Sequence, residues 1–144
     1  DAGGETRWGI SSKYNPDIDV RTLTREMAAR IWKERYLADW GLERFPQATA
    51  HKLTDLLCTR NRLPEAIEML QRALWSASGD PLKVDGVYGP ITKARLEAQA
   101  ASPQGERELV IALRCEIASC YERIVAQNEF QRNNLAGWIN RARS

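Results

Sequence analysis

The sequence predicts a mainly α fold, a single domain with a short loop or strand element at its N-terminal end. Three observations support this prediction. Apolar residues recur at helical spacing over most of the chain after residue 23. Proline, glycine and hydroxyl residues separate these stretches at positions where helices begin or end. Residues 1–21 instead contain Gly3-Gly4, Gly9 and Asn15-Pro16, which leave no room for a helix.

The size and charge of the chain describe an ordinary soluble domain. Its 144 residues are close to the usual length of one domain, and 43% are hydrophobic and 28% charged. A net charge of +2 lacks the basic surface of a nucleic-acid-binding protein, so we expect no nucleic acid partner. No segment approaches the roughly 20 apolar residues that a membrane span needs, so we expect no stable membrane insertion.

The cysteines argue against a disulfide framework and against a metal site. There are three, Cys58, Cys115 and Cys120, and an odd number excludes complete pairing. No Cys-x-x-Cys pair is present and the chain has one histidine, which argues against a zinc site. We therefore expect reduced thiols and no metal.

The elements follow from local patterns. Residues 6–11 alternate polar and larger side chains and are predicted to form a short strand. A helix capped by Thr24 and ended by Gly41 follows, with an apolar face made of Met27, Ala28, Ile31, Trp32 and Tyr36. Further helices are predicted from near Pro46, from Pro64, from Pro90, over residues 106–127 and around Trp138. Their expected core residues are Ala50, Leu53, Leu56, Leu57, Ala66, Ile67, Leu70, Leu74, Ile91, Ala94, Leu96, Leu109, Ala112, Leu113, Ile117, Tyr121, Ile124, Leu135 and Ile139.

The first ten residues hold the groups that could carry chemistry. Asp1, Gly3-Gly4 and Thr6 lie just ahead of Trp8-Gly9-Ile10. Glycines allow a sharp turn or a close approach of the backbone to a ligand. Glycoside hydrolysis uses two carboxylates, and a threonine hydroxyl can hold the attacking water. On composition alone, the same residues also describe a plain loop.

The full string, Asp-x-Gly-Gly-x-Thr-x-aromatic-Gly-Ile, closely resembles the N-acetylmuramidases of glycoside hydrolase family 108, which are phage-endolysin-like peptidoglycan hydrolases. The Thr24-capped helix with its aromatic residues follows in the same order. A Leu-Gln helix at 70–74 and the Asp-Gly-x-x-Gly-x-x-Thr segment at 85–92 look like the predicted peptidoglycan-binding region of that family. Residues 137–141 are similar to its closing helix. These matches cover nearly the whole chain.

The resemblance implies a lysozyme-like fold with a catalytic portion at 1–62 and a helical peptidoglycan-binding portion at 63–144 packed on it. In the family, a glutamate shortly upstream of the aspartate matched by Asp1 donates the proton. Asp1 would support the charge that develops on the sugar or position the attacking water, and Thr6 would hydrogen-bond that water. Because the general-acid glutamate is expected before Asp1, we expect the chain to be an N-terminally truncated part of a longer protein.

The expected substrate-binding residues are Gly3, Gly4, Trp8, Tyr36 and Asp85. Trp8 would stack on a sugar ring. Asp85, with Gly86 and Gly89, forms either a ligand-contacting loop or a turn in which its carboxylate caps backbone N–H groups.

Other aromatic and charged residues are expected to have structural roles. Helical spacing assigns Trp32, Trp75, Tyr121 and Trp138 to the core. Residues 30–35 hold charges that are expected on the wet face of the first helix. His51 is expected to be solvated or to take part in a helix cap, and not to be catalytic.

The predicted function is hydrolysis of the β-1,4 bond between N-acetylmuramic acid and N-acetylglucosamine in peptidoglycan, for cell lysis or wall remodelling. No cofactor is expected. The protein is expected to be a monomer that is made in the cytoplasm and acts on the wall in the periplasm or outside the cell, with a holin as the export route of an endolysin. One alternative is a catalytically inactive peptidoglycan-binding protein that keeps the fold. The other is a helical interaction protein that matches the motif by chance.

Overall fold

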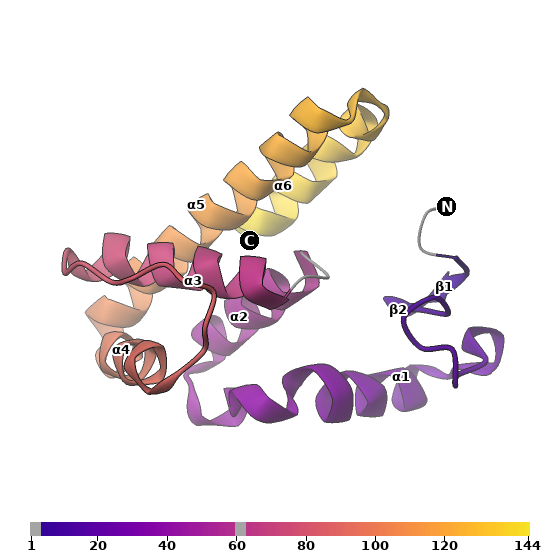
Figure 1. Ribbon diagram of the computed structural model, residues 1–144, viewed down its shortest axis with the longest axis horizontal. Helices are drawn as coiled ribbons and strands as arrows, with labels where there is room; N and C mark the ends of the chain where they lie inside the picture. The colour runs from indigo at the N-terminus through magenta and orange to yellow at the C-terminus, as the bar shows by residue number, and fades with distance from the viewer. Residues whose placement is uncertain (1–3, 60–62) are drawn as a thin grey trace. The chain divides into compact units, whose positions relative to one another are not determined.

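The computed structural model describes residues 4–59 and 63–144, and the mainly helical prediction is confirmed (Figure 1). The chain forms two compact units that divide between Gly41 and Leu42. The first contains a small hairpin and the first helices. The second contains the remaining helices. Among the described residues, no helix is both long enough and apolar enough to cross a membrane.

The N-terminal element is a hairpin and not the single strand predicted. Strands β1 (Thr6–Arg7) and β2 (Ile10–Ser11) are antiparallel, with Thr6 opposite Ser11 and Arg7 opposite Ile10. Trp8 and Gly9 join them with φ angles of 54° and 78°. Two consecutive residues with positive φ are typical of the type I′ turn that closes two-residue hairpins. The chain therefore reverses in the middle of the alternating pattern.

The helical part of the first unit consists of η1 (Val20–Thr22), α1 (Arg25–Ile31), the π-helical η2 (Trp32–Leu37) and η3 (Ala38–Trp40). Thr24 caps α1 as predicted, because its side-chain oxygen accepts from the backbone N–H of Met27 at 3.2 Å. Met27 itself is exposed, so its place on the apolar face was predicted wrongly. The core of this unit consists of Ile10, Val20, Leu23 and Ala28, with Ile18, Ile31 and Trp32 packed against it.

The second unit is organised around one long helix. It contains η4 (Leu42–Arg44), α2 (Gln47–Thr59), α3 (Leu63–Ser78), α4 (Pro90–Ala100), α5 (Pro103–Gln127), η5 (Glu129–Asn134) and α6 (Leu135–Arg143). Helix α5 packs against α2, α3, α4 and α6, and α6 runs back beside it (Figure 1). Helix α5 begins at Pro103, a turn earlier than predicted, because Ser102 accepts from the backbone N–H of Gly105 and caps the helix.

Most of the predicted core of this unit is buried. The confirmed positions are Leu53, Leu56, Ala66, Ile67, Leu70, Leu74, Leu96, Leu109, Ala112, Leu113, Ile117 and Tyr121. Ile91 is 72% exposed, so its prediction as a core residue was wrong. The buried side of α4 carries Thr92, Leu96 and Ala100, at four-residue spacing, and Ile91 lies about 100° away from Thr92 around the helix. Trp75 is also exposed and not in the core, whereas Tyr121 and Trp138 stack with ring centroids 5.1 Å apart.

Candidate functional site

The hairpin brings together three of the predicted site residues, Gly4, Thr6 and Trp8. Gly4 has a φ of 71°, and a Cβ atom there would lie 2.9 Å from Oγ of Ser12. A Cβ atom at Gly9 would lie 3.1 Å from the ring of Trp32. Both glycines therefore provide a left-handed backbone and a close approach that a larger residue would disturb.

Trp8 lies at the tip of the hairpin and is 51% exposed. Its φ of 54° is in the left-handed region, which costs an L-residue about 1–2 kcal/mol. The indole N–H of Trp32 donates to the backbone carbonyl of Trp8 at 3.0 Å and so supports this conformation. Trp32 is therefore more than a core residue, since its polar atom fixes the turn. An exposed indole with a fixed backbone is a suitable surface for stacking a sugar ring.

Thr6 is exposed on the outer face of the hairpin. Residues that are directly opposite in a sheet share a face, so Thr6 and Ser11 lie opposite to the face of the buried Ile10. The Thr6 hydroxyl donates to the Gly4 carbonyl at 3.4 Å, which is a long hydrogen bond. This hydroxyl can therefore also contact water or a ligand.

Charged residues tie the hairpin to the segments that follow it. The Arg21 Nε atom lies 3.6 Å from Oε2 of Glu5 and 3.3 Å from Oδ1 of Asp19. The Arg7 guanidinium donates to the backbone carbonyl of Arg21. Glu5 thus connects the start of β1 to η1. These exposed pairs fix the position of the hairpin more than they stabilise the fold.

Arg35 makes a second link within this unit, although the sequence placed it on the wet face of the first helix. Its guanidinium donates to Oδ1 of the buried Asn15 at 3.2 Å and forms a forked pair with Asp17. The Arg35 hydrogen bonds hold the pKa of the Asp17 carboxyl below its usual value. The signal was present in the sequence only as Asn15 and Asp17 around Pro16, with no indication of the partner.

The remaining predicted site residues are Asp1, Gly3, Tyr36 and Asp85. Asp1 and Gly3 lie outside the described residues. Tyr36 belongs to η2, and its side chain also lies outside them. Asp85 belongs to the second unit, in the loop between α3 and α4.

The loop that contains Asp85 is organised by Gln71, a buried residue of α3 that sequence analysis placed only in a motif. The Gln71 Nε2 atom lies within hydrogen-bond distance of three acceptors, Oδ1 of Asp85 at 2.9 Å, the Thr92 hydroxyl at 3.1 Å and the Val87 carbonyl at 3.2 Å, which share its two N–H groups. Its Oε1 atom accepts from the backbone N–H groups of Asp85 and Gly86. Hydrogen bonds from the Gln71 side chain and then from the Val87 backbone lower the pKa of Asp85. These hydrogen bonds of Asp85 are the ones expected of a residue that organises a turn.

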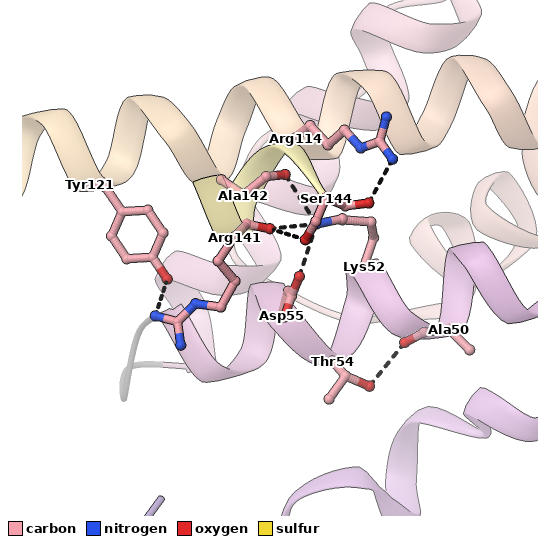
Figure 2. Close-up of polar contacts among 9 residues, drawn as sticks. All are labelled: Ala50, Lys52, Thr54, Asp55, Arg114, Tyr121, Arg141, Ala142 and Ser144. Carbon is pink, nitrogen blue, oxygen red and sulfur yellow. Dashed lines mark hydrogen bonds and ion pairs between the residues drawn. The ribbon is translucent and has the colours of Figure 1, made fainter. Parts of the chain in front are cut away.

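A pocket of about 440 Å³ lies among α2, α5 and α6 and was not expected from the sequence. Figure 2 shows the polar contacts of several residues that line it, among them Lys52, Asp55, Arg114 and Arg141. The ammonium of Lys52, whose side chain is 4% exposed, donates to Oδ2 of Asp55 at 2.9 Å and to the carbonyls of Arg141 and Ala142 at 3.2 and 3.0 Å. Arg114 and Arg141 also line the pocket, together with the exposed His51. In the described part of the chain, no group of three or more His, Cys, Asp or Glu residues is arranged to hold a metal ion.

Comparison with protein families assigns both parts of the chain. Residues 65–143 match the family described as Predicted Peptidoglycan domain, and residues 1–59 match Glycosyl hydrolase 108. Comparisons with curated proteins and with solved structures gave no match. The two matches confirm the resemblance that the sequence motifs indicated. Because the first match spans more than half of the 144 residues, the chain belongs to the predicted peptidoglycan domain family, and it carries a glycosyl hydrolase 108 segment ahead of that domain.

Proposed function

We propose that the protein is a muramidase that binds peptidoglycan and hydrolyses the β-1,4 bond between N-acetylmuramic acid and N-acetylglucosamine. The observation that carries this proposal is the order of the two family matches, a glycosyl hydrolase segment followed by a peptidoglycan domain. Under this proposal, both segments act on the same polymer, the peptidoglycan of the bacterial cell wall. The proposal divides the work between a cleavage site in the first unit and a wall-binding surface in the second.

The hairpin supplies the geometric support for the cleavage site. Its two glycines allow the left-handed backbone and the close packing on Ser12 and Trp32 that shape the hairpin, and Thr6 offers a hydroxyl on the exposed face. Trp8 offers an apolar ring at the tip. Asp1 would act on the developing sugar charge or position water, and Thr6 would orient that water. The general-acid glutamate is the one that the family resemblance puts before Asp1.

The test measures the release of reducing ends from purified peptidoglycan. The assay uses the 144-residue chain and, where the gene encodes residues upstream, a version that includes them. We expect hydrolysis by the version that contains the glutamate, and a strong loss of rate in its Asp1→Ala and Thr6→Ala variants. Ser76→Ala, which removes an exposed hydroxyl from α3, is the matched control. Full activity in the Asp1→Ala, Thr6→Ala double variant would refute the site.

A second candidate function is wall binding without cleavage. The peptidoglycan domain match, which is the longer of the two, favours it. Co-sedimentation with purified peptidoglycan separates the candidates. Pelleting with no release of reducing ends from any version supports the binding protein, pelleting with release supports the muramidase, and failure to pellet contradicts both.

A further inference from the structure

The pocket among α2, α5 and α6 has the lining of an anion site. Its positively charged residues are Lys52, Arg114 and Arg141, and its negatively charged residue is Asp55. With histidine counted as neutral, the side chains of the lining carry a net charge of +2, in a protein whose side chains over all 144 residues also sum to only +2. A volume of about 440 Å³ is within the range of small-molecule sites.

The Lys52 ammonium is not the group that would bind a ligand. An ammonium has three donors, and Asp55 and the carbonyls of Arg141 and Ala142 use all three. The same contacts occupy the Asp55 carboxylate and fix the end of α6. Lys52 and Asp55 therefore form part of the wall, and the recognition falls to the two arginines.

The guanidinium groups of Arg114 and Arg141 each use few of their N–H donors within the described residues. Within residues 4–59 and 63–144, Arg114 donates one hydrogen bond, from Nη2 to the Ser144 carbonyl at 2.8 Å. Arg141 likewise donates one, to the Tyr121 hydroxyl at 3.3 Å, and lies over the Tyr121 ring at 6.0 Å (Figure 2). A guanidinium carries five N–H donors in a planar fork. Each arginine is thus held in place by one bond, with the rest of its fork available to an acceptor.

The Nε atom of Arg114 adds an independent observation. It is buried and has no hydrogen-bond partner among the described residues. Nearly all buried polar atoms in folded proteins have a partner, so an unpaired N–H beside a pocket points to an acceptor that completes it. Because Nε is covered by protein atoms, the acceptor would reach it after a small rotation of the guanidinium, or would bind the terminal nitrogens first.

We propose that this pocket binds a carboxylate, with the forks of Arg114 and Arg141 as its donors. A planar carboxylate accepts two parallel hydrogen bonds from a guanidinium, which an alcohol or an amide oxygen of a sugar cannot do. The assignment of the carboxylate to the peptide part of peptidoglycan rests on the proposed function. The carboxylate specificity itself rests only on the pocket.

The test titrates the ¹⁵N-labelled protein with N-acetyl-D-alanine and, separately, with N-acetyl-D-alanine amide, which differs only in lacking the charge. We expect the Arg114 Nε–H resonance to shift with the acid and not with the amide. Arg114→Gln and Arg141→Gln should each weaken binding of the acid by about tenfold or more. Arg114→Lys keeps the charge but loses the fork, so it should bind less tightly than the parent protein.

Arg123→Gln on α5 and Arg143→Gln on α6 are the matched controls, because both arginines are exposed and do not line the pocket. Equal shifts with the acid and the amide, or equal loss of binding in the control variants, would overturn the proposal. Thermal unfolding of each variant identifies one that has lost its fold, and the Nε–H resonance of the parent protein then decides alone.

Co-sedimentation keeps this inference separate from the proposed function. Binding of the acid by a protein that does not pellet with peptidoglycan leaves the carboxylate pocket standing and removes its source in the wall. Pelleting by a protein that does not distinguish the acid from the amide leaves wall binding standing and overturns the carboxylate pocket.

Discussion

The side-chain amide of Gln71 forms two hydrogen bonds with Asp85. Its Nε2 atom donates to the carboxylate at 2.9 Å, and its Oε1 atom accepts from the backbone N–H at 2.9 Å. No rotation of the amide or exchange of its atoms would satisfy both ends, because the carboxylate needs a donor and the N–H an acceptor. Gln71 thereby decides the shape of the loop between α3 and α4.

Replacement of Gln71 should destabilise the second unit. Gln71→Leu removes the amide that bonds the loop at Asp85, Gly86 and the buried Thr92, at a cost of roughly 1–3 kcal/mol in the free energy of unfolding. Gln71→Glu, which has the same shape, should cost at least as much, because it places a carboxylate against that of Asp85. Chemical denaturation measures both. Gln127→Leu, at the exposed end of α5, is the control and should change stability little; equal losses in Gln71→Leu and Gln127→Leu would contradict the role of Gln71.

The lowered pKa of Asp85 predicts how the stability of the protein changes at acidic pH. Its ordinary value is 3.8, and the folded protein holds it below that value. The folded state therefore favours the ionised carboxylate, and the resulting stability is fully present above pH 3.8 and is lost as the pH falls through the folded pKa. Asp85→Asn keeps an oxygen for the Gln71 amide but does not titrate. The difference in unfolding free energy between parent and variant should be constant above about pH 5 and shrink toward pH 2; a difference that grows on acidification would show the wrong sign.

Substitutions at two glycines, Gly79 and Gly86, distinguish the cost of a left-handed backbone from the cost of a steric clash. Gly79 and Gly86 have almost the same φ, 73° and 71°. A Cβ atom at Gly79 would meet nothing within 4 Å, whereas one at Gly86 would lie 3.1 Å from the Pro64 carbonyl. Gly79→Ala should therefore cost about 1–2 kcal/mol for the left-handed conformation alone. Gly86→Ala should cost more, and equal costs in thermal or chemical unfolding would show that Pro64 moves away freely.

Lys52 should be more important for stability than any exposed lysine. Lys52→Met fills a similar volume but removes the ammonium that donates to the Ala142 carbonyl, the Arg141 carbonyl and the Asp55 carboxylate. We expect a loss of roughly 1–3 kcal/mol. Lys83→Met, at a side chain that is 85% exposed, is the control and should change stability little. A Lys52→Met protein as stable as this control would show that water replaces the ammonium.

The helices could be predicted because their signals are local. Thr24, Pro64 and Pro90 mark helix starts through their own side chains and backbone. Apolar spacing then located most of the core. Ile91 failed because apolar residues alone do not say which side of a short helix meets its neighbour, and on α4 that side includes the polar Thr92.

The site could be predicted only in part. The hairpin residues are contiguous in the motif, so Gly4, Thr6 and Trp8 were found together. Lys52 was missed because its acceptors at Arg141 and Ala142 lie 89 and 90 residues away in the chain. A lysine on the buried side of a helix, between Thr49 and Leu53, is the signal that could have indicated it. Gln71 lies in a recognised motif, but its role depends on a loop whose path the sequence does not specify.

At Trp8, the residue that would best stabilise the hairpin turn differs from the one that places an aromatic ring at its tip. Asparagine and glycine suit that backbone better than tryptophan, and the Trp32 hydrogen bond needs only the carbonyl of residue 8. A Trp8→Gly change should therefore make the hairpin easier to form while removing the ring from its tip. If that ring contacts glycan, selection has kept a residue that the turn itself disfavours, and the variant should melt at a higher temperature while cleaving or binding cell wall less well.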